Sequence, residues 1–315
     1  MLHQKPDIFC KIELGLPLSK VQDLLAEIDS NYGERIKYKI DSEGQRKRNK
    51  PKYEEKLGEF CTRVINPPAD RLKRIQKRIN KYLNAKIHLP KYAYGAVKDK
   101  DNVKNAREHK GQKYVFQTDI RDFFPSISYK RVYAALTSAG FSPDVASLIT
   151  RLTTYKGHLP QGAPTSTFLA NLVFSTTGDQ IQHIANQYNL RFTTFVDDVT
   201  LSSQSDFKDL VPTIIGIITD AGYKISHSKT TYKSGITEIT GVKMLNNAMT
   251  VTDKFRVKLD NELNSEATIK GLQNYKSRVK EISSKHVDCN AKFPHVYNCK
   301  RDHRMKVFRF AVSKS

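Results

Sequence analysis

Two adjacent aspartates, Asp197 and Asp198, stand between short runs of aromatic, β-branched and hydroxyl residues in FTTFVDDVTLSS, residues 192–203. The flanking runs are typical of β-strands, but aspartate is depleted in strands and two like charges repel each other. One interpretation of the pair is a solvated turn between two strands. The other is a site for a divalent cation, because hard cations take carboxylate oxygens as ligands.

A third carboxylate would favour the cation site, and Asp119 supplies it. The segment KYVFQTDI, residues 113–120, predicts a strand that ends at Asp119. If this strand lies beside the aspartate hairpin in one sheet, two cations about 4 Å apart can bind between the carboxylates. One cation would activate a hydroxyl nucleophile, and the other would hold a triphosphate and stabilise the leaving pyrophosphate. The pattern therefore indicates two-metal nucleotidyl transfer.

The segments around these aspartates predict a mixture of helices and strands. Ser19, with Gln22 three residues later, predicts the N-cap of a first helix. Residues 231–235 and 240–245 predict strands. Apolar residues at helical spacing predict helices within residues 18–28, 70–83, 128–140, 142–155, 167–188 and 207–222. Because strands and helices do not alternate regularly, this order favours an α+β fold in which helices back an antiparallel sheet.

The composition favours a polyanionic partner. The 315 residues carry a formal net charge of +21, and the surface should attract nucleic acid first and anionic membranes second. Residues 42–58 predict a flexible basic loop, and the chain from residue 253 onward is basic and predicted to be helical. No apolar stretch approaches the roughly 20 residues that cross a bilayer, and residues 1–15 lack the apolar run of a signal peptide. We therefore expect a cytoplasmic protein that does not bind membranes.

Four cysteines, Cys10, Cys61, Cys289 and Cys299, are scattered along the chain and form no disulfide framework, which suits the reducing cytosol. The last two stand among three histidines in residues 286–303, so a zinc site is conceivable. Their spacing matches no closed Cys/His pattern. Ordinary side chains in a basic tail are the favoured interpretation.

Five segments resemble the successive palm motifs of reverse transcriptases, and they occur in that family's order: TDIRDFFPSIS, LPQGAPTSTFLANLVF, FVDD, SHSKT and TGV. Each segment alone is a weak signal, whereas the ordered set is specific. The resemblance implies a right-hand polymerase fold with fingers, a palm built on an antiparallel sheet backed by helices, and a short helical thumb. It implies an N-terminal segment and fingers over 1–115, a palm over 116–250 and a basic thumb over 251–315, with part of 130–160 assignable to the fingers.

Two further segments are similar to signatures of bacterial retron reverse transcriptases. NAREH, residues 105–109, matches N-A-x-x-H, and ITGV, residues 239–242, is close to V-T-G with an isoleucine in place of valine. The segment TRVINPPADRLKRIQKRI, residues 62–79, is similar to the finger segment of the same group. The resemblance implies a role in RNA recognition or priming for Asn105, Ala106 and His109.

The resemblance assigns roles at the metal site by motif position. Asp119 and Asp197 would bind both metal ions, and Asp198 would complete the carboxylate cluster. Ile120 would offer its backbone carbonyl to the ion on the nucleotide. The implied ions are two Mg²⁺, with Mn²⁺ as a possible substitute.

Five other residues would bind the incoming nucleotide. Phe124 matches the bulky residue that excludes a ribose 2′-hydroxyl, although without the motif it reads equally well as a core phenylalanine. Gln161 matches the residue near the sugar, and Gly162 would let backbone approach the substrate. Lys229 matches the lysine that protonates or neutralises the leaving pyrophosphate. Arg63 resembles the finger arginine that grips the triphosphate.

Two positions depart from the family pattern. Phe195 replaces the tyrosine of the usual Tyr-x-Asp-Asp, which keeps the ring and loses the hydroxyl. Ser226 and His227 stand where an asparagine usually precedes the lysine. Contacts with the primer terminus are expected to change, and metal binding is expected to survive.

The leading hypothesis is a retron reverse transcriptase that copies part of a cognate structured noncoding RNA into single-stranded DNA of the msDNA type. Its partners would be that RNA and its DNA product, dNTPs, and an effector protein in anti-phage defence. One alternative is another defence-associated or mobile-element reverse transcriptase without branched priming from a 2′-hydroxyl. A second is an inactive scaffold that binds RNA, and the presence of Asp119, Asp197 and Asp198 argues against it.

Overall fold

A five-stranded antiparallel sheet carries the aspartates. The computed structural model describes residues 5–38, 45–46, 61–261 and 265–284. In it, the central strand β3 (Tyr114–Arg121) has the β4–β5 hairpin on one side and two short strands on the other. Their bounds are β4 (Arg191–Phe195), β5 (Asp198–Ser203), β6 (Lys224–Ile225) and β7 (Thr231–Ser234). The expected pairing of the Asp119 strand with the aspartate hairpin is therefore confirmed.

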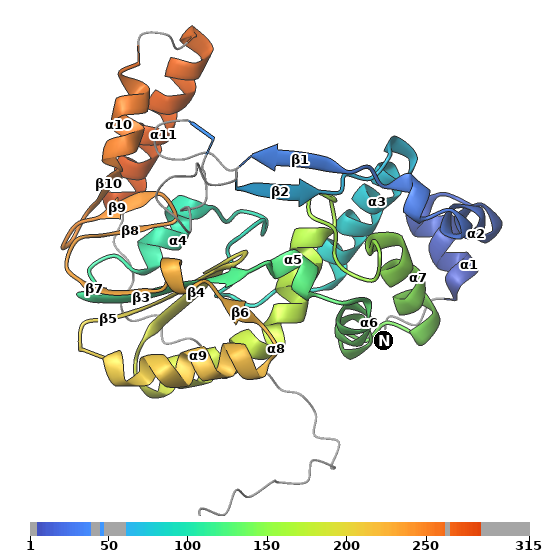
Figure 1. The fold of residues 1–315 in the computed structure, drawn as a ribbon, viewed down its shortest axis with the longest axis horizontal. Helices are drawn as coiled ribbons and strands as arrows, with labels where there is room; N and C mark the ends of the chain where they lie inside the picture. Colours follow the sequence, from blue (N-terminus) through green and yellow to red (C-terminus); the bar gives the residue numbers. More distant parts are fainter. Residues whose placement is uncertain (1–4, 39–44, 47–60, 262–264, 285–315) are drawn as a thin grey trace, which may run out of the picture. The chain divides into compact units, whose positions relative to one another are not determined.

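Two helices cover one face of this sheet, as Figure 1 shows. These are α8 (Ser166–Gln187) and α9 (Val211–Asp220), which pack against each other. The first half of α8 is buried on nearly every side, because it lies between the sheet and other helices. The connections carry the short helix α5 (Phe123–Ser126) and the 3₁₀ turns η3 (Lys208–Leu210) and η4 (His227–Lys229).

The N-terminal part of the described chain is mainly helical. It contains α1 (Pro6–Phe9), the π-helical turn η1 (Cys10–Leu14), α2 (Leu18–Ala26), the 3₁₀ turn η2 (Asp29–Asn31) and α3 (Asp70–Lys86). These pack with α6 (Tyr129–Ser138) and α7 (Pro143–Thr153). Their buried apolar side chains belong to the same hydrophobic core as those of the large sheet. The fingers expected in this region and the large sheet thus share one core.

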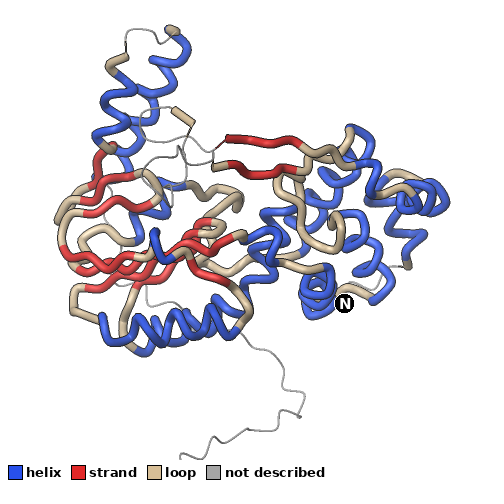
Figure 2. Tube along the Cα trace, viewed as in Figure 1, coloured by secondary structure: helices blue, strands red, loops and turns tan. Residues whose placement is uncertain are grey.

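A separate two-stranded antiparallel sheet is formed by β1 (Arg35–Tyr38) and β2 (Thr62–Ile65). Figure 2 shows these strands apart from the strands of the large sheet. Almost all of their residues are exposed, including the apolar Ile36 and Val64. The large sheet does not bury this hairpin, although its end reaches the loop that contains Gln161, as described below.

A second, smaller hydrophobic core unites α4 (Asn102–Glu108) with a three-stranded sheet and the last described helix. The sheet consists of β8 (Thr237–Ile239), β9 (Val242–Met244) and β10 (Met249–Val251). The helices that follow are α10 (Asp253–Leu259) and α11 (Glu266–Ser284), and α11 packs on β10. Ala106 of α4 is fully buried in this core, together with Met244, Met249 and Val279.

The predicted helices are all present, with one error at the first of them. Ser19 is not an N-cap, because α2 begins at Leu18 and Pro17 occupies the cap position without a side-chain hydrogen bond. Proline has the fixed φ and the missing N–H that suit a helix start, and this outweighs the Ser19 and Gln22 pattern. The strand expected to end at Asp119 continues to Arg121, since Ile120 and Arg121 pair with β6.

Several sequence predictions lie outside the described residues. These are all of the expected basic loop over residues 42–58 except residues 45–46, and the tail from residue 285, which contains Cys289, Cys299 and the neighbouring histidines. The domain boundaries at 115 and 250 stay predictions. Within the described residues, no helix combines the length and apolarity needed to cross a bilayer.

Candidate active site

Three carboxylates meet where β3 and β5 pair. Asp119 lies directly opposite Asp198 in the antiparallel register, and Asp197 precedes Asp198 at the tip of the β4–β5 hairpin. One ligand oxygen from each of the three lies within 4.8 Å of the others. The Ile120 backbone N–H donates to the Asp197 carbonyl over 2.9 Å, which fixes the hairpin tip to β3. The expected cluster of Asp119, Asp197 and Asp198 therefore exists.

The hairpin tip is a two-residue turn of unusual backbone. Phe195 pairs with Asp198, so Val196 and Asp197 are the turn residues. Val196 has a φ of +61°. Positive φ at the first turn residue is the pattern of a type II′ turn, which normally has glycine there. A β-branched residue at positive φ is strained, so tertiary contacts must hold this turn in place.

The three carboxylates crowd negative charge into a partly buried site. Burial raises the pKa of Asp198 to about 6, and the negative charges of Asp197 and Asp119 add to the rise. Burial also raises the pKa of Asp197, although the charges of Lys229 and Arg63 work in the opposite direction. Hard oxygen donors with mutual repulsion are suited to Mg²⁺, which would relieve that repulsion. The donor set thus fits the expected metal.

Lys229 lies at the edge of the cluster. Its Nζ forms an ion pair with Asp119 Oδ2, and its side chain remains 62% exposed. The 3₁₀ turn η4, which contains Lys229, is fixed to β3 by a hydrogen bond from Ser226 N to the Asp119 carbonyl of 2.8 Å. The residue assigned to the pyrophosphate is therefore next to the carboxylates, and its exposed ammonium can reach a ligand.

The nucleotide-binding residues expected from two distant motifs are brought together. Asn66, just after β2, donates its backbone N–H to the Gln161 carbonyl over 2.8 Å. Gly162 has a φ of +104°, and a Cβ there would lie 3.7 Å from Ile65 on β2. Arg63 on the same strand is close enough to influence the Asp197 carboxyl. The β1–β2 hairpin and the Gln161 loop therefore form one side of the site.

Phe124 and Ile120 lie on the β3 side. Ile120 is buried in β3 next to Asp119. Phe124 follows in α5, is partly buried, and has its ring centroid 5.9 Å from that of Phe123. Phe123 carries the core packing on Phe174 and Tyr223. Phe123 is thus buried in the core, whereas Phe124 packs against the core and is only partly buried.

The retron signature residues lie in buried contacts away from the carboxylates. His109 is 1% exposed, and its two ring nitrogens lie 2.7 Å from Ser202 Oγ and 2.7 Å from Thr193 Oγ1. Burial lowers the pKa of His109 to about 3, with the charge of Arg191 adding to the effect. The imidazole is thus neutral and joins α4 to both strands of the aspartate hairpin.

Asn105 is equally buried, at 1% exposure, and its Nδ2 donates to Thr240 Oγ1 over 3.3 Å. Asn102 of the same helix donates from Nδ2 to the Thr240 carbonyl and to the Tyr275 hydroxyl of α11. Neither Asn105 nor His109 presents its side chain at the surface. Any role in priming would be exerted through the elements that these residues connect.

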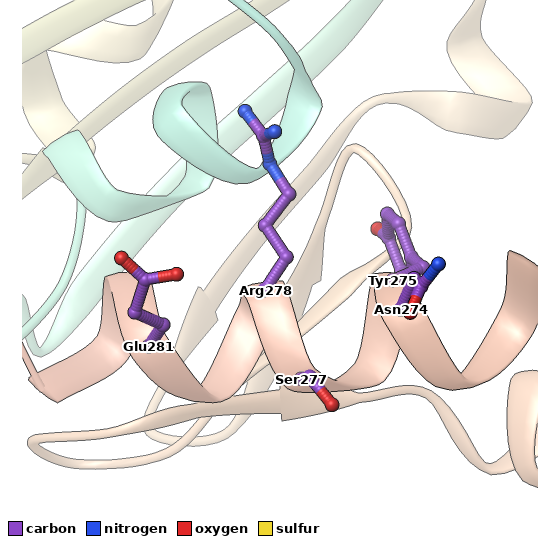
Figure 3. Close-up of a pocket in the computed structure, with 5 residues that line it drawn as sticks. All are labelled: Asn274, Tyr275, Ser277, Arg278 and Glu281. Atoms are coloured by element: carbon purple, nitrogen blue, oxygen red, sulfur yellow. The ribbon is translucent and has the colours of Figure 1, made fainter.

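A hollow of about 550 Å³ lies along α11 at this junction, lined by Asn274, Tyr275, Ser277, Arg278 and Glu281. Figure 3 shows Arg278 extending from α11 toward the neighbouring helix. Its guanidinium forms an ion pair with Asp101, the residue that caps α4. The polar face of α11 is therefore anchored to the start of the helix that contains the signature residues.

Two residues that hold the tip of the β4–β5 hairpin in place were not identified from the sequence. Gly95 packs against Val196, and Asn171 of α8 donates a hydrogen bond to the Gly95 carbonyl. A signal existed for Asn171, since a lone amide within the apolar run FLANLVF needs a buried partner. The YAYG segment before residue 96 offered no comparable signal.

Comparison with known families agrees with this geometry. The sequence profile of the family "Reverse transcriptase (RNA-dependent DNA polymerase)" matches residues 51–257. The chain belongs to the reverse transcriptase family. This membership confirms the expected right-hand polymerase fold, whose palm sheet and helices are described above.

Several curated relatives of this reverse transcriptase are retron enzymes by name, which confirms the resemblance to the bacterial retron type. It is 34% identical over 175 residues to the retron Se72 reverse transcriptase of Salmonella heidelberg, covering 54% of this chain and 46% of the relative. It is 34% identical over 180 residues to the retron Ec86 reverse transcriptase of Escherichia coli, covering 56% of each. The match thus spans about half the length of these relatives.

Among solved structures, the chain is similar to a telomerase from Candida albicans in complex with a TWJ fragment of telomeric RNA. The TM-score is 0.48 at 11% identity, over 82% of this chain and 52% of the telomerase chain.

Proposed function

We propose that this retron-type reverse transcriptase copies an RNA template into DNA by two-metal nucleotidyl transfer. The observation that carries the proposal is the cluster of Asp119, Asp197 and Asp198, whose oxygens converge within 4.8 Å on two paired strands. Clustered carboxylates alone occur in many metal-dependent enzymes, so it is membership of the reverse transcriptase family that indicates which reaction this cluster would support. Retron reverse transcriptases among the relatives support an RNA template and a DNA product.

The carboxylates would hold two Mg²⁺ ions, or Mn²⁺ in their place. Asp119 and Asp197 would each contact both ions, Asp198 would complete the cluster, and the Ile120 carbonyl would contribute to the ion on the nucleotide side. When bound, the ions lower the pKa of the attacking hydroxyl and neutralise charge on the triphosphate. The raised pKa values of Asp197 and Asp198 are consistent with this assignment: burial is their main cause and the neighbouring carboxylates add to it, and a bound cation would stabilise the charged forms against both effects.

The residues around the cluster would orient the dNTP. Arg63 would grip the triphosphate from the β1–β2 hairpin, and Gln161 and Gly162 would lie against the sugar and base. The hydrogen bond between Asn66 and Gln161 supports a shared binding surface, because it ties the two segments together. The partly buried Phe124 would occupy the space of a ribose 2′-hydroxyl and thereby select deoxynucleotides.

Lys229 would act on the leaving group. Its exposed ammonium lies beside Asp119, so it can donate a proton to the pyrophosphate oxygen as the bond to the α-phosphorus breaks. The same ammonium pairs with Asp119, which neutralises one carboxylate. The residue would therefore change partner when the substrate binds.

At a finer level, we propose that the template is a cognate structured noncoding RNA, that the product is single-stranded msDNA, and that the system serves anti-phage defence with an effector protein. A cytoplasmic location would suit these partners. The support is the naming of the relatives as retron enzymes and the two retron signatures, Asn105–Ala106–His109 and Thr240–Gly241. A net charge of +21 would favour association with RNA of any sequence.

The experiment compares DNA synthesis on a primed RNA template by wild type and by a double variant, Asp197→Ala with Asp198→Ala. We expect no dNTP incorporation by the double variant and unchanged RNA binding, because these carboxylates hold metal and are not core residues. The matched control is Asp220→Ala, since Asp220 is an exposed carboxylate at the end of α9. Metal-dependent synthesis by the double variant would refute the proposal.

A further inference from the structure

A short extended segment, residues 92–95, lies alongside the strand that leads into the aspartate hairpin. Tyr94 donates its backbone N–H to the Thr194 carbonyl over 2.8 Å, and Thr194 donates in turn to the Tyr92 carbonyl over 2.8 Å. Ala93 and Thr194 form a parallel bridge. Because Thr194 is two residues before Val196, this segment supports β4 up to the turn that contains Asp197.

Gly95, at the end of the segment, packs directly on that turn. A Cβ at position 95 would lie 2.5 Å from the Val196 backbone nitrogen and would overlap its Cγ2. No flexible side-chain end is available to yield, because the closest atoms belong to the backbone and the branched stem of Val196. Gly95 has no positive φ that would itself require glycine, so the close approach is the reason for glycine here.

The segment is held from its other side by α8 and by a lysine. Asn171, 5% exposed, donates from Nδ2 to the Gly95 carbonyl over 2.8 Å, and the Tyr92 hydroxyl donates to Asp179 Oδ1 over 2.7 Å. Lys100 donates to the Ala93 carbonyl over 2.8 Å. The segment is therefore fixed between α8 and the hairpin and cannot retreat without breaking these bonds.

We propose that Gly95 and Asn171 are positioning residues for Asp197. The turn needs such support because Val196 has a φ of +61°, a conformation that a β-branched residue keeps only when its surroundings impose it. Gly95 packs directly against Val196. Asn171 fixes the position of Gly95 by donating a hydrogen bond to the Gly95 carbonyl. Together they hold the Asp197 carboxylate close to that of Asp119, with neither residue touching metal or nucleotide. The inference rests on the metal role of Asp197 proposed above.

A second consequence concerns α8. This helix begins at Ser166, immediately after the loop that contains Gln161 and Gly162. Asn171 lies on its second turn. The hydrogen bond from Asn171 to Gly95 thus links the element behind the nucleotide-binding loop to the metal-binding turn.

The test measures Mn²⁺ affinity directly. Free Mn²⁺ is followed by electron paramagnetic resonance in a complex of the full-length protein with an RNA template, a primer ending in a dideoxynucleotide, and the next dNTP. The Mn²⁺ bound at the carboxylates is the difference in bound Mn²⁺ between the wild type and the double variant, Asp197→Ala with Asp198→Ala. We expect Gly95→Ala and Asn171→Ala each to weaken this Mn²⁺ binding by about tenfold, as loss of a supporting contact typically does. RNA binding should be retained.

The controls separate positioning from a general loss of stability. Gly216→Ala in α9 is the matched substitution, because a Cβ there meets nothing within 4 Å, and it should leave Mn²⁺ binding unchanged. Adding Val196→Gly to Gly95→Ala removes the overlap with Cγ2 and relaxes the turn, so it should restore part of the Mn²⁺ affinity. If Gly95→Ala fails to fold, Asn171→Ala still tests the inference, since it removes one hydrogen bond and introduces no overlap.

Two results would count against the inference. Wild-type Mn²⁺ affinity in folded Gly95→Ala and Asn171→Ala would overturn it while leaving the proposed function intact. Equal Mn²⁺ binding by wild type and the double aspartate variant would refute the proposed metal role itself, and the inference with it.

Discussion

Asn105 and Thr240 are in contact, although 135 positions separate them in the chain: Asn105 Nδ2 donates to Thr240 Oγ1 over 3.3 Å. Thr240 Oγ1 donates onward to the Asn102 carbonyl over 3.0 Å. The two retron signatures, NAREH and ITGV, therefore form one partly buried contact between α4 and the turn that joins β8 to β9. This contact links the aspartate hairpin, through His109, to the sheet and helix of the smaller core.

The contact predicts coupled effects on stability. Thr240→Val should lower the free energy of unfolding by about 1–3 kcal/mol, because it leaves the buried amide nitrogen of Asn105 without its partner. Asn105→Ala should lower it by about 1 kcal/mol, because Thr240 Oγ1 keeps its hydrogen bond to the Asn102 carbonyl. The double variant should lose less than the sum of the two, as expected for residues in one network. Urea denaturation gives all three values, with Thr240→Ser as a control that keeps the hydroxyl. Additive losses would show that the hydrogen bond contributes nothing.

The same contact bears on priming. Asn105→Ala combined with His109→Ala should reduce RNA-linked DNA from the cognate RNA more than it reduces extension of an annealed primer. The reason is that α4 connects the aspartate hairpin to the smaller core, and the cognate RNA proposed above would have to contact both. Gel analysis of both reactions with one enzyme preparation makes the comparison. Equal loss in the two reactions would assign these residues a purely structural role.

His109 predicts a pH-dependent loss of stability. Its folded-state pKa is about 3, whereas an unfolded chain has the ordinary value near 6.5, so below that value only the unfolded state takes up the proton. The stabilising effect of the neutral imidazole is complete above pH 6.5 and falls as the pH drops toward 3. From about pH 6.5 to 5, this residue alone should remove roughly 2 kcal/mol.

Urea unfolding at several pH values checks this expectation. In His109→Gln the free energy of unfolding should fall less steeply over that range than in wild type, whatever its value near neutral pH. Identical slopes for the two proteins would show that His109 is protonated in the folded state.

Phe124 predicts the choice of sugar. Phe124→Val should raise the ratio of rNTP to dNTP incorporation, because a smaller side chain leaves room for the 2′-hydroxyl. Single-nucleotide incorporation kinetics give the ratio of kcat/KM for the two substrates. Phe123→Leu is a useful comparison, since Phe123 is 3% exposed and packs in the core beside it. A ratio unchanged in Phe124→Val would mean that this ring also serves only the core.

Much of the palm could be predicted from the sequence, because its determinants are local. Strand propensity and the Asp-Asp pair indicated the hairpin, and apolar spacing indicated the helices. The meeting of Asp119 with Asp198 followed from one assumption, that their strands are neighbours, and the register confirms it. The three-stranded sheet of β8, β9 and β10 was less evident, since strands of three residues carry little pattern.

The supports of the site could not be predicted in the same way. Gly95 and Val196 are about a hundred positions apart, and the reason for glycine at 95 is a close approach that only the folded chain reveals. The roles of Asn105 and His109 illustrate the same limit. The resemblance suggested RNA contacts, and the structure shows that both side chains are buried in hydrogen bonds with distant strands and loops.

The central claim is that Asp119, Asp197 and Asp198 bind two metal ions for nucleotidyl transfer. The most direct measurement is anomalous X-ray scattering from Mn²⁺ in crystals of the enzyme with an RNA template, a dideoxy-terminated primer and the next dNTP. The account predicts two Mn²⁺ peaks about 4 Å apart, in contact with these three carboxylates, and their loss in crystals of Asp197→Ala with Asp198→Ala. A complex that holds primer and dNTP in place with no Mn²⁺ at these carboxylates would contradict it.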